Sequence, residues 1–172
     1  FPEKDIDKFK RSMSEMLVAN GFYEIVTNSL TNLAYQRKHN LTFKGEPVEM
    51  LNKLSEEQGI LRQTMLFTGL EAAAYNINRK QKDLKLFEFG KIYNKAEGKY
   101  EEEGRLALYM TGNNEPENWR NPSKPLTYHD LAQETVHILQ KSGLFGLKEE
   151  SIQHPLLEYG IRVLNGQKEV AV

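Results

Sequence analysis

The chain has 172 residues, of which 39% are hydrophobic and 27% charged, and its formal net charge is -1. This composition is typical of one globular domain over 1–172, and the small net charge excludes an overall polycation, so any nucleic-acid contact has to come from a local patch. The absence of cysteine excludes disulfides, thiolate zinc sites and cysteine nucleophiles.

The N-terminal third of the chain predicts a helix followed by strands. Residues 3–22 carry apolar side chains at helical spacing on one face, with Asp5 or Asp7 placed to cap the helix. Residues 22–31 are rich in β-branched and aromatic side chains, which favours a strand. Residues 41–51 contain a glycine and a proline between two apolar runs, which predicts a hairpin.

The middle of the chain predicts a helix and two strands. The helix over 68–82 opens on Thr68 and Glu71, which form a capping-box pattern. Residues 83–93 are apolar on both strand faces, as in a central strand that is covered on two sides. Residues 105–112 form the next predicted strand.

The last third predicts a loop, a helix and a hairpin. Three prolines make 113–127 a long loop or a lid, and 128–143 has the apolar spacing of a helix. In the hairpin over 159–172, Asn165 and Gly166 suit a type I′ turn. Helices between hairpin-joined strands indicate an α+β domain with an antiparallel sheet flanked by helices.

A basic turn is the first candidate site. It consists of Arg79, Lys80, Lys82 and Lys85. These cations could contact tRNA phosphates, but cations at the end of a helix also complement the helix dipole, and we favour that structural interpretation.

Three further motifs have structural explanations. His129 and Asp130 are adjacent on a helix and do not face each other, which favours a capping or surface role over acid–base chemistry. The glycines of 143–148 lack the spacing of a phosphate-binding loop. The acidic run 101–103 cannot converge on one cation without a specially folded loop. No metal site is predicted.

Several linked segments resemble one family. They are "GFYEIVTNSLT", "LSEEQGILRQTMLFTGLEAAAYNINRKQKDLKLFEFGKIY", "YHDLAQETVHILQKSGL" and "HPLLEYGIRVLNGQKEVAV". Together they are similar to the catalytic-like core module of the bacterial phenylalanyl-tRNA synthetase β chain. The resemblance implies a fold related to class II aminoacyl-tRNA synthetase cores. It also implies that the chain is one module of a longer protein.

The sequence has no apolar run of the roughly 20 residues that would span a bilayer and no signal peptide before its first helix, which predicts a cytoplasmic protein without membrane contact. The resemblance implies an α₂β₂ phenylalanine-tRNA ligase that uses ATP and Mg. Its α chain would activate phenylalanine and transfer it to tRNA, while this module would support assembly, bind no cofactor and catalyse nothing. Class II cores end the strand corresponding to "FGKIY" with an arginine and an acid that hold ATP. Asn94, Lys95 and Ala96 stand at these positions instead, and no catalytic role is expected for Arg62.

The first helix resembles the element through which class II cores dimerise. Its apolar residues are therefore interface candidates: Ile6, Phe9, Met13, Met16 and Leu17. They could equally pack only on their own sheet, because both roles need the same apolar stripe.

Two other functions stay open at this point. One is a divergent class II-like ligase that activates a small acid with ATP, for which Arg62, Arg79 or Arg105 would have to supply the cationic clamp. The other is a plain tRNA-binding module centred on the basic turn.

Overall fold

The computed structural model describes residues 5–39, 41–53, 55, 58–115, 119–120 and 122–172. The chain forms two compact units, one made of residues 1–35 and 42–126 and the other of residues 36–41 and 127–172. A short helix, α2 (Leu33–Lys38), crosses from the first range to the second.

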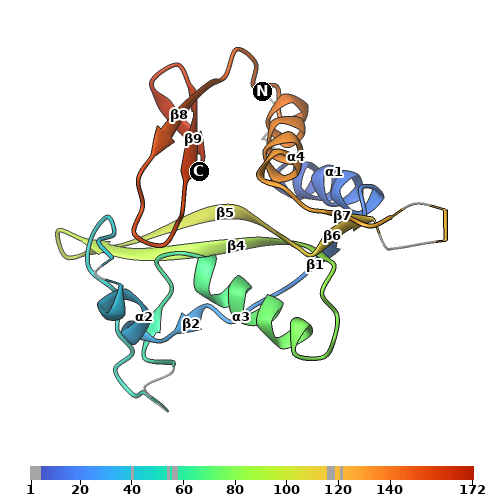
Figure 1. Cartoon of the computed structure of the whole chain (residues 1–172). Coiled ribbons are helices and arrows are strands. Elements are labelled where there is room, and N and C mark those ends of the chain that lie inside the picture. Colours follow the sequence, from blue (N-terminus) through green and yellow to red (C-terminus); the bar gives the residue numbers. More distant parts are fainter. Residues whose placement is uncertain (1–4, 40, 54, 56–57, 116–118, 121) are drawn as a thin grey trace. The chain divides into compact units, whose positions relative to one another are not determined.

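The first unit is built around a three-stranded sheet with the strand order β1-β4-β5. Its elements are α1 (Ile6–Ala19), β1 (Tyr23–Glu24), β2 (Leu30–Thr31), β3 (Ile60–Leu61), α3 (Leu66–Ile77), β4 (Leu84–Ala96), β5 (Lys99–Thr111), β6 (Asn113–Glu115) and β7 (Lys124–Pro125). Strands β4 and β5 pair antiparallel along their whole length, whereas β1 runs parallel to β4 (Figure 1). Two short antiparallel pairs, β2–β3 and β6–β7, complete the unit.

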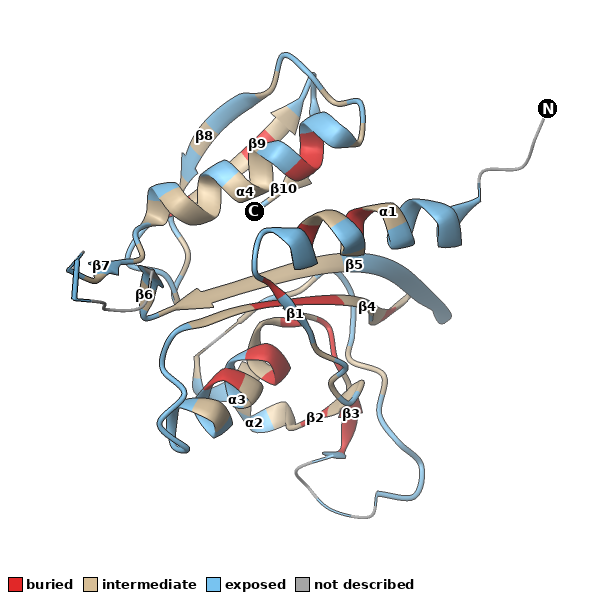
Figure 2. Cartoon of the chain, turned by 90° about the vertical axis from the view of Figure 1, so that its right-hand side faces the viewer, coloured by how far each residue is buried: buried red, intermediate tan, exposed pale blue. Residues whose placement is uncertain are grey.

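Strand β4 is covered on both faces, as its sequence predicts. Leu86 is 4% exposed and Phe87 is fully buried, and as neighbours on a strand they point to opposite faces of the sheet. Helix α1 lies on one face and α3 on the other (Figure 2). A mainly antiparallel sheet with helices on its faces confirms the predicted α+β class.

Helix α1 begins and ends where the sequence predicts. The Asp5 side chain accepts a hydrogen bond of 2.9 Å from the Lys8 backbone N–H, which satisfies one of the free donors of the first turn. The chain leaves the helix through Gly21, whose φ of +84° suits a residue without a side chain.

Two predictions in the first unit are wrong. Residues 22–31 form two short strands instead of one, because the Asn28 side chain accepts the Leu30 N–H and turns the chain between them. Residues 41–51 do not form a hairpin with themselves. Their backbone instead makes isolated bridges to β4 and β3, at Glu46–Lys95 and Glu49–Ile60.

Helix α3 also differs from its prediction. It begins at Leu66, and Thr68 lies inside it, where its hydroxyl donates to the Met65 carbonyl at 3.2 Å. Its buried residues are Thr68, Gly69 and Ala73. The helix starts two residues earlier than predicted, and Leu70 within it is 50% exposed.

The second unit contains α4 (Tyr128–Lys141), β8 (Lys148–Ile152), β9 (Gly160–Asn165) and β10 (Lys168–Ala171). The strands form an antiparallel sheet in the order β10-β9-β8. The predicted last hairpin is present, but Asn165 pairs with Lys168, so Gly166 is the first central residue of the turn. Gly166 has a φ of +62° and Gln167, the second central residue, has no positive φ, a pattern of type II′ and not the predicted type I′.

Candidate functional site

The end of β4, where a nucleotide site would need a cation and an acid, holds the buried, neutral Asn94 and the half-buried Lys95. Asn94 is 8% exposed, and its side-chain amide lies 2.7 Å from that of Gln63. Gln63 also donates to the Gly45 carbonyl at 3.2 Å. Reciprocal backbone hydrogen bonds of 2.8 and 2.9 Å between Glu46 and Lys95 hold this segment against the strand. Residues 44–46 therefore close over the position of Asn94.

A buried ion pair lies further back on β4. Arg62 and Glu88 are each 2% exposed, and the Arg62 Nη2 lies 3.0 Å from the Glu88 Oε1. Glu88 also accepts hydrogen bonds from the Thr27 N–H at 3.2 Å and from the Thr27 hydroxyl at 2.8 Å. The carboxylate is thus paired and hydrogen-bonded, which burial of a charge requires.

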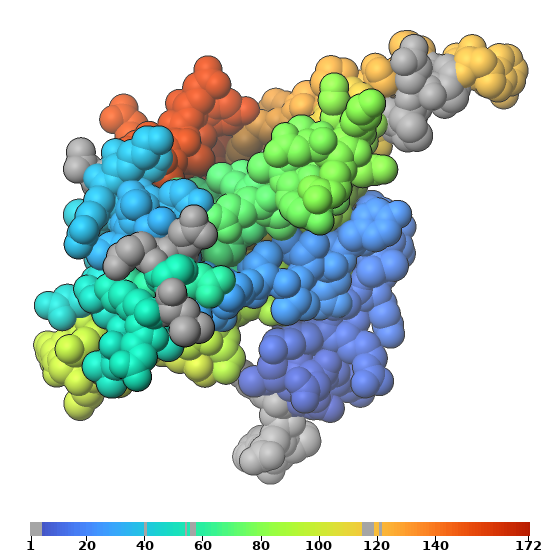
Figure 3. Space-filling model, turned by 90° about the horizontal axis from the view of Figure 1, so that it is seen from below, coloured from blue at the N-terminus to red at the C-terminus, as the bar shows by residue number. Residues whose placement is uncertain are grey.

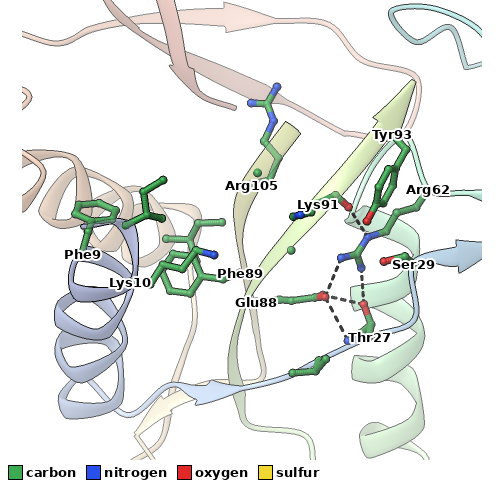
Figure 4. A pocket seen from close by; sticks show the side chains of 15 residues that line it. Phe9, Lys10, Thr27, Ser29, Arg62, Glu88, Phe89, Lys91, Tyr93 and Arg105 are labelled. Atoms are coloured by element: carbon green, nitrogen blue, oxygen red, sulfur yellow. Dashed lines mark hydrogen bonds and ion pairs between the residues drawn. The ribbon is translucent and has the colours of Figure 1, made fainter. Parts of the chain in front are cut away.

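Arg62 joins four separate segments of the first unit. Its Nη1 donates to the Thr27 hydroxyl at 2.7 Å, and its Nε donates to the Lys91 carbonyl at 2.9 Å (Figure 4). Nη1 also donates to the Thr68 hydroxyl at 3.2 Å. Gly90 leaves the room for this guanidinium, since a Cβ there would lie 2.2 Å from Nη2. The planar fork of donors is fully engaged in holding the fold.

The sheet face under α3 is filled by Tyr109. A Cβ on Gly69 would lie 1.9 Å from the Tyr109 Cζ, so the tyrosine ring occupies the space of the missing side chain. The Tyr109 hydroxyl donates to the Met65 carbonyl at 2.7 Å. Burial, with a smaller contribution from the Glu88 charge, raises the pKa of Tyr109 well above its ordinary value. This part of the face has no space for a substrate.

The face on the α1 side carries a cavity of about 500 Å³. Phe9 and Lys10 of α1 lie on one side of it, Phe89 and Lys91 of β4 line its floor, and Arg105 of β5 stands at its edge (Figure 4). The surface is hollowed between α1 and the β4–β5 hairpin (Figure 3). Arg62 and Glu88 form the inner wall.

The five interface candidates of α1 are divided by the fold. Met13 is 2% exposed and Leu17 is fully buried, which places both in the core of the first unit, and Met16 is intermediate. Ile6 is 63% exposed and Phe9 is 45% exposed. Only the N-terminal half of the stripe is therefore open to another chain, and its role as an interface stays a prediction.

Arg79, Lys80 and Lys82 of the basic turn lie between α3 and β4, and Lys85 lies at the start of β4. Lys80 has a φ of +69°, unusual for a residue with a side chain. The Arg79 guanidinium lies 3.4 Å from the centroid of the Tyr75 ring and donates to the Tyr75 carbonyl at the end of the helix. Arg79, Lys80 and Lys82 are exposed and Lys85 is half-buried. The contact of these residues with tRNA stays a prediction.

The other motifs have the structural roles that we favoured. Asp130 accepts hydrogen bonds from the backbone and hydroxyl of Thr127, so it completes the capping box of α4. Gly143 and Gly146 have positive φ at the end of α4 and in the turn after it. The acidic run 101–103 pairs with three different cations. Among the described residues, no group of acidic or histidine side chains is arranged around a common point that could hold a metal ion.

Sequence reasoning missed Glu88 and the role of Arg62. Glu88 lies within the apolar run "LFEFG", and a single acid among buried neighbours was the available signal that it needed a cationic partner. Arg62 lies between β3 and α3, and apart from Thr68 its partners come from residues 26 to 35 positions away in the chain. Such pairings cannot be read from local spacing.

The fold is that of class II tRNA synthetases. It resembles a pyrrolysyl tRNA synthetase of Desulfitobacterium hafniense, with a TM-score of 0.68 and 18% identity over 96% of this chain and 54% of that one. A second similar structure is an ATP phosphoribosyltransferase regulatory subunit/histidyl-tRNA synthetase of Bacillus halodurans, with a TM-score of 0.63 and 17% identity over 88% of this chain and 38% of that one.

The family follows from the sequence comparisons. The family model described as the phenylalanyl tRNA synthetase beta chain CLM domain matches residues 2–172, and the chain belongs to this family. It is 37% identical to the phenylalanine–tRNA ligase beta subunit of Bacteroides thetaiotaomicron over 147 residues and 30% identical to that of Symbiobacterium thermophilum over 159 residues.

The alignments cover 80% and 88% of the chain, respectively, but the chain spans only 18% of the length of either relative. Within the described residues, every helix is too short or too polar to cross a membrane.

Proposed function

We propose that this chain is a non-catalytic assembly module of a phenylalanine-tRNA ligase β chain. In this role it supports an α chain that charges tRNA with phenylalanine, within a cytoplasmic α₂β₂ enzyme. ATP and Mg act at the α chain, and the module itself binds neither. The proposal extends to one module, 1–172, of a longer protein.

The observation that carries the proposal is the closed face under α3. Asn94 and Gln63 place neutral amides where a nucleotide would need a cation and an acid, and residues 44–46 lie over them. Tyr109 fills the neighbouring part of the same face. A reaction site needs charged groups aimed at an open pocket, whereas the charges of Arg62 and Glu88 are aimed at each other.

The alternative of a divergent ligase loses support because its three candidate arginines are engaged. Arg62 is neutralised by Glu88, Arg79 stacks on Tyr75, and the Arg105 Nη2 lies 2.8 Å from a Glu103 carboxylate oxygen. Arg62 could act as a cationic clamp on a nucleotide only by leaving a buried carboxylate, which is costly, whereas the pair of Arg105 is exposed and holds that guanidinium weakly.

Two measurements test the proposal. Calorimetric titration of the chain with ATP should give no binding in the micromolar range, and the chain should not support phenylalanine-dependent pyrophosphate exchange. Deleting the module from the full-length β chain should abolish co-purification with the α chain. Micromolar ATP affinity, or intact assembly after the deletion, would overturn the proposal.

The tRNA-binding alternative depends on the basic turn and has its own test. If Lys80 and Lys82 contact phosphates, neutralising both should weaken tRNA binding by the assembled enzyme and reduce its salt dependence by about one unit per lost contact. We expect unchanged binding, because cations at the end of α3 are explained by the helix dipole.

A further inference from the structure

Two asparagine–glycine pairs occur in the chain, Asn20–Gly21 and Asn165–Gly166. Glycine has no side chain to shield its amide nitrogen, so this nitrogen can attack the side-chain carbonyl carbon of the preceding asparagine. The attack requires a glycine N–H that is free of hydrogen bonds and a backbone that can turn toward the asparagine side chain. The fold surrounds the two pairs differently.

The first pair is held against the core of the first unit. The Gly21 N–H donates to the Val18 carbonyl at 3.0 Å. The next N–H, that of Phe22, donates to the Leu17 carbonyl at 3.0 Å, and both of these residues are buried. Freeing the Gly21 amide therefore requires the end of α1 to unwind and the core beside it to open.

The second pair lies at the tip of the β9–β10 hairpin. Residues 165–169 are all exposed, and a Cβ on Gly166 would meet nothing within 4 Å. Asn165 and Lys168 close a turn of two residues, in which the N–H of the first central residue is not needed for the turn hydrogen bond. Within the described part of the chain, nothing accepts a hydrogen bond from the Gly166 N–H, and no hydrogen bond restrains the Asn165 side chain.

We propose that Asn165 is a site of spontaneous deamidation in the folded protein. Base removes the proton of the Gly166 amide, and the amide nitrogen forms a bond to the Asn165 Cγ. The bond from Cγ to Nδ2 breaks, and Nδ2 takes up a proton and leaves as ammonia. Water then opens the five-membered succinimide, so the reaction consumes one water, releases one ammonia and needs no oxidant or reductant.

The two products change the hairpin in different ways. Opening of the ring at Cγ gives aspartate, which places a negative charge opposite Lys168. Opening at the main-chain carbonyl gives isoaspartate, in which the main chain runs through the former side chain and gains one methylene group. The longer main chain disrupts the register between residues 165 and 168. This inference is independent of the proposed assembly function, because it depends only on the β9–β10 turn.

The first experiment incubates the full-length β chain at mildly alkaline pH and follows the peptides that contain Asn20 and Asn165 by mass spectrometry. Deamidation raises the mass of a peptide by about one dalton, and electron-transfer fragmentation separates aspartate from isoaspartate. We expect Asn165 to deamidate more than about tenfold faster than Asn20, which corresponds to a difference of about 1.4 kcal/mol in the cost of freeing the two amides.

The same chain unfolded in concentrated urea is the control. Both pairs are then free of native contacts, so the two rates should lie within about threefold of each other. A ratio below about tenfold in the native chain would overturn the proposal. So would an Asn165 peptide that keeps its mass in the native chain while the unfolded chain reacts.

The variant Asn165→Gln tests the assignment to this residue. Glutamine would have to form a six-membered ring, which closes far more slowly, so the peptide around position 165 should keep its mass. A thermal melt equal to that of the unmodified chain shows that the variant is folded. A gain of about one dalton that persists in the variant would come from another amide, such as that of Gln167, and would refute the assignment.

Discussion

The buried pair of Arg62 and Glu88 gives the sharpest test of what holds the first unit together. Replacing Arg62 by methionine keeps most of the side-chain volume but removes the charge and every hydrogen bond of the guanidinium. Glu88 then remains buried, with only the two hydrogen bonds from Thr27. Breaking a buried pair in this way typically costs about 3–5 kcal/mol, because an uncompensated charge is left behind.

The local geometry places Arg62→Met at the upper end of that range. Four hydrogen bonds of the guanidinium disappear together, to Thr27, Thr68, Glu88 and the Lys91 carbonyl. The two threonine hydroxyls retain other contacts, so the largest loss is at Glu88. Adding Glu88→Gln to the Arg62→Met background removes the orphan charge and should restore about 1–2 kcal/mol.

Urea unfolding followed by far-ultraviolet circular dichroism measures these differences. Arg105→Met is the matched control, because it breaks an exposed pair with Glu103 and should cost less than about 1 kcal/mol. A loss below about 1 kcal/mol in Arg62→Met would refute the view that this network supports the fold. So would a double variant that is no more stable than Arg62→Met.

Three further predictions concern the same unit. Gly90→Ala should destabilise it by about 2 kcal/mol or more, measured by thermal melts, because the new Cβ meets the Arg62 guanidinium. Gly104→Ala is the control: its new Cβ meets nothing within 4 Å, so the stability should change by less than about 1 kcal/mol. Tyr109→Phe should cost about 1 kcal/mol at neutral pH. Because folding raises the pKa of Tyr109, the contribution of this residue to the free energy of unfolding is complete below the ordinary tyrosine pKa of about 10 and is lost at higher pH. The loss of stability at alkaline pH should therefore be smaller in Tyr109→Phe than in the unmodified chain. An equal loss in the two proteins would contradict this. Met13→Glu should unfold the unit, because Met13 is 2% exposed; a folded variant that only loses α-chain binding would show that Met13 faces a partner instead.

The elements that were predicted correctly are specified by residues within them or next to their ends. Residues 83–93 are apolar on both faces, so their place at the centre of a sheet follows from the sequence alone. Helix α1 contains its cap, Asp5, and its stop, Gly21, within a few residues of its ends. Local signals of this kind do not depend on the rest of the chain.

The errors arise where distant contacts decide the structure. Gly45 and its neighbours looked like the turn of a hairpin, but the segment pairs with Lys95, which lies 50 positions later. Thr68 looked like a helix cap, yet it hydrogen-bonds to Arg62 inside the unit. The absence of a charged pair after β4 was visible in the sequence, whereas the segment that covers Asn94 was not.

Strand β5 is the outer strand of its sheet, and no strand in the described part of the chain pairs with its free side. An open edge thirteen residues long is a template on which unrelated chains can add further strands and aggregate. Seven consecutive residues at the start of β5, Lys99 to Arg105, are exposed and five of them are charged. Their charge and hydration oppose such pairing, so the acidic run that breaks up the apolar pattern of the hairpin also disfavours aggregation along this edge.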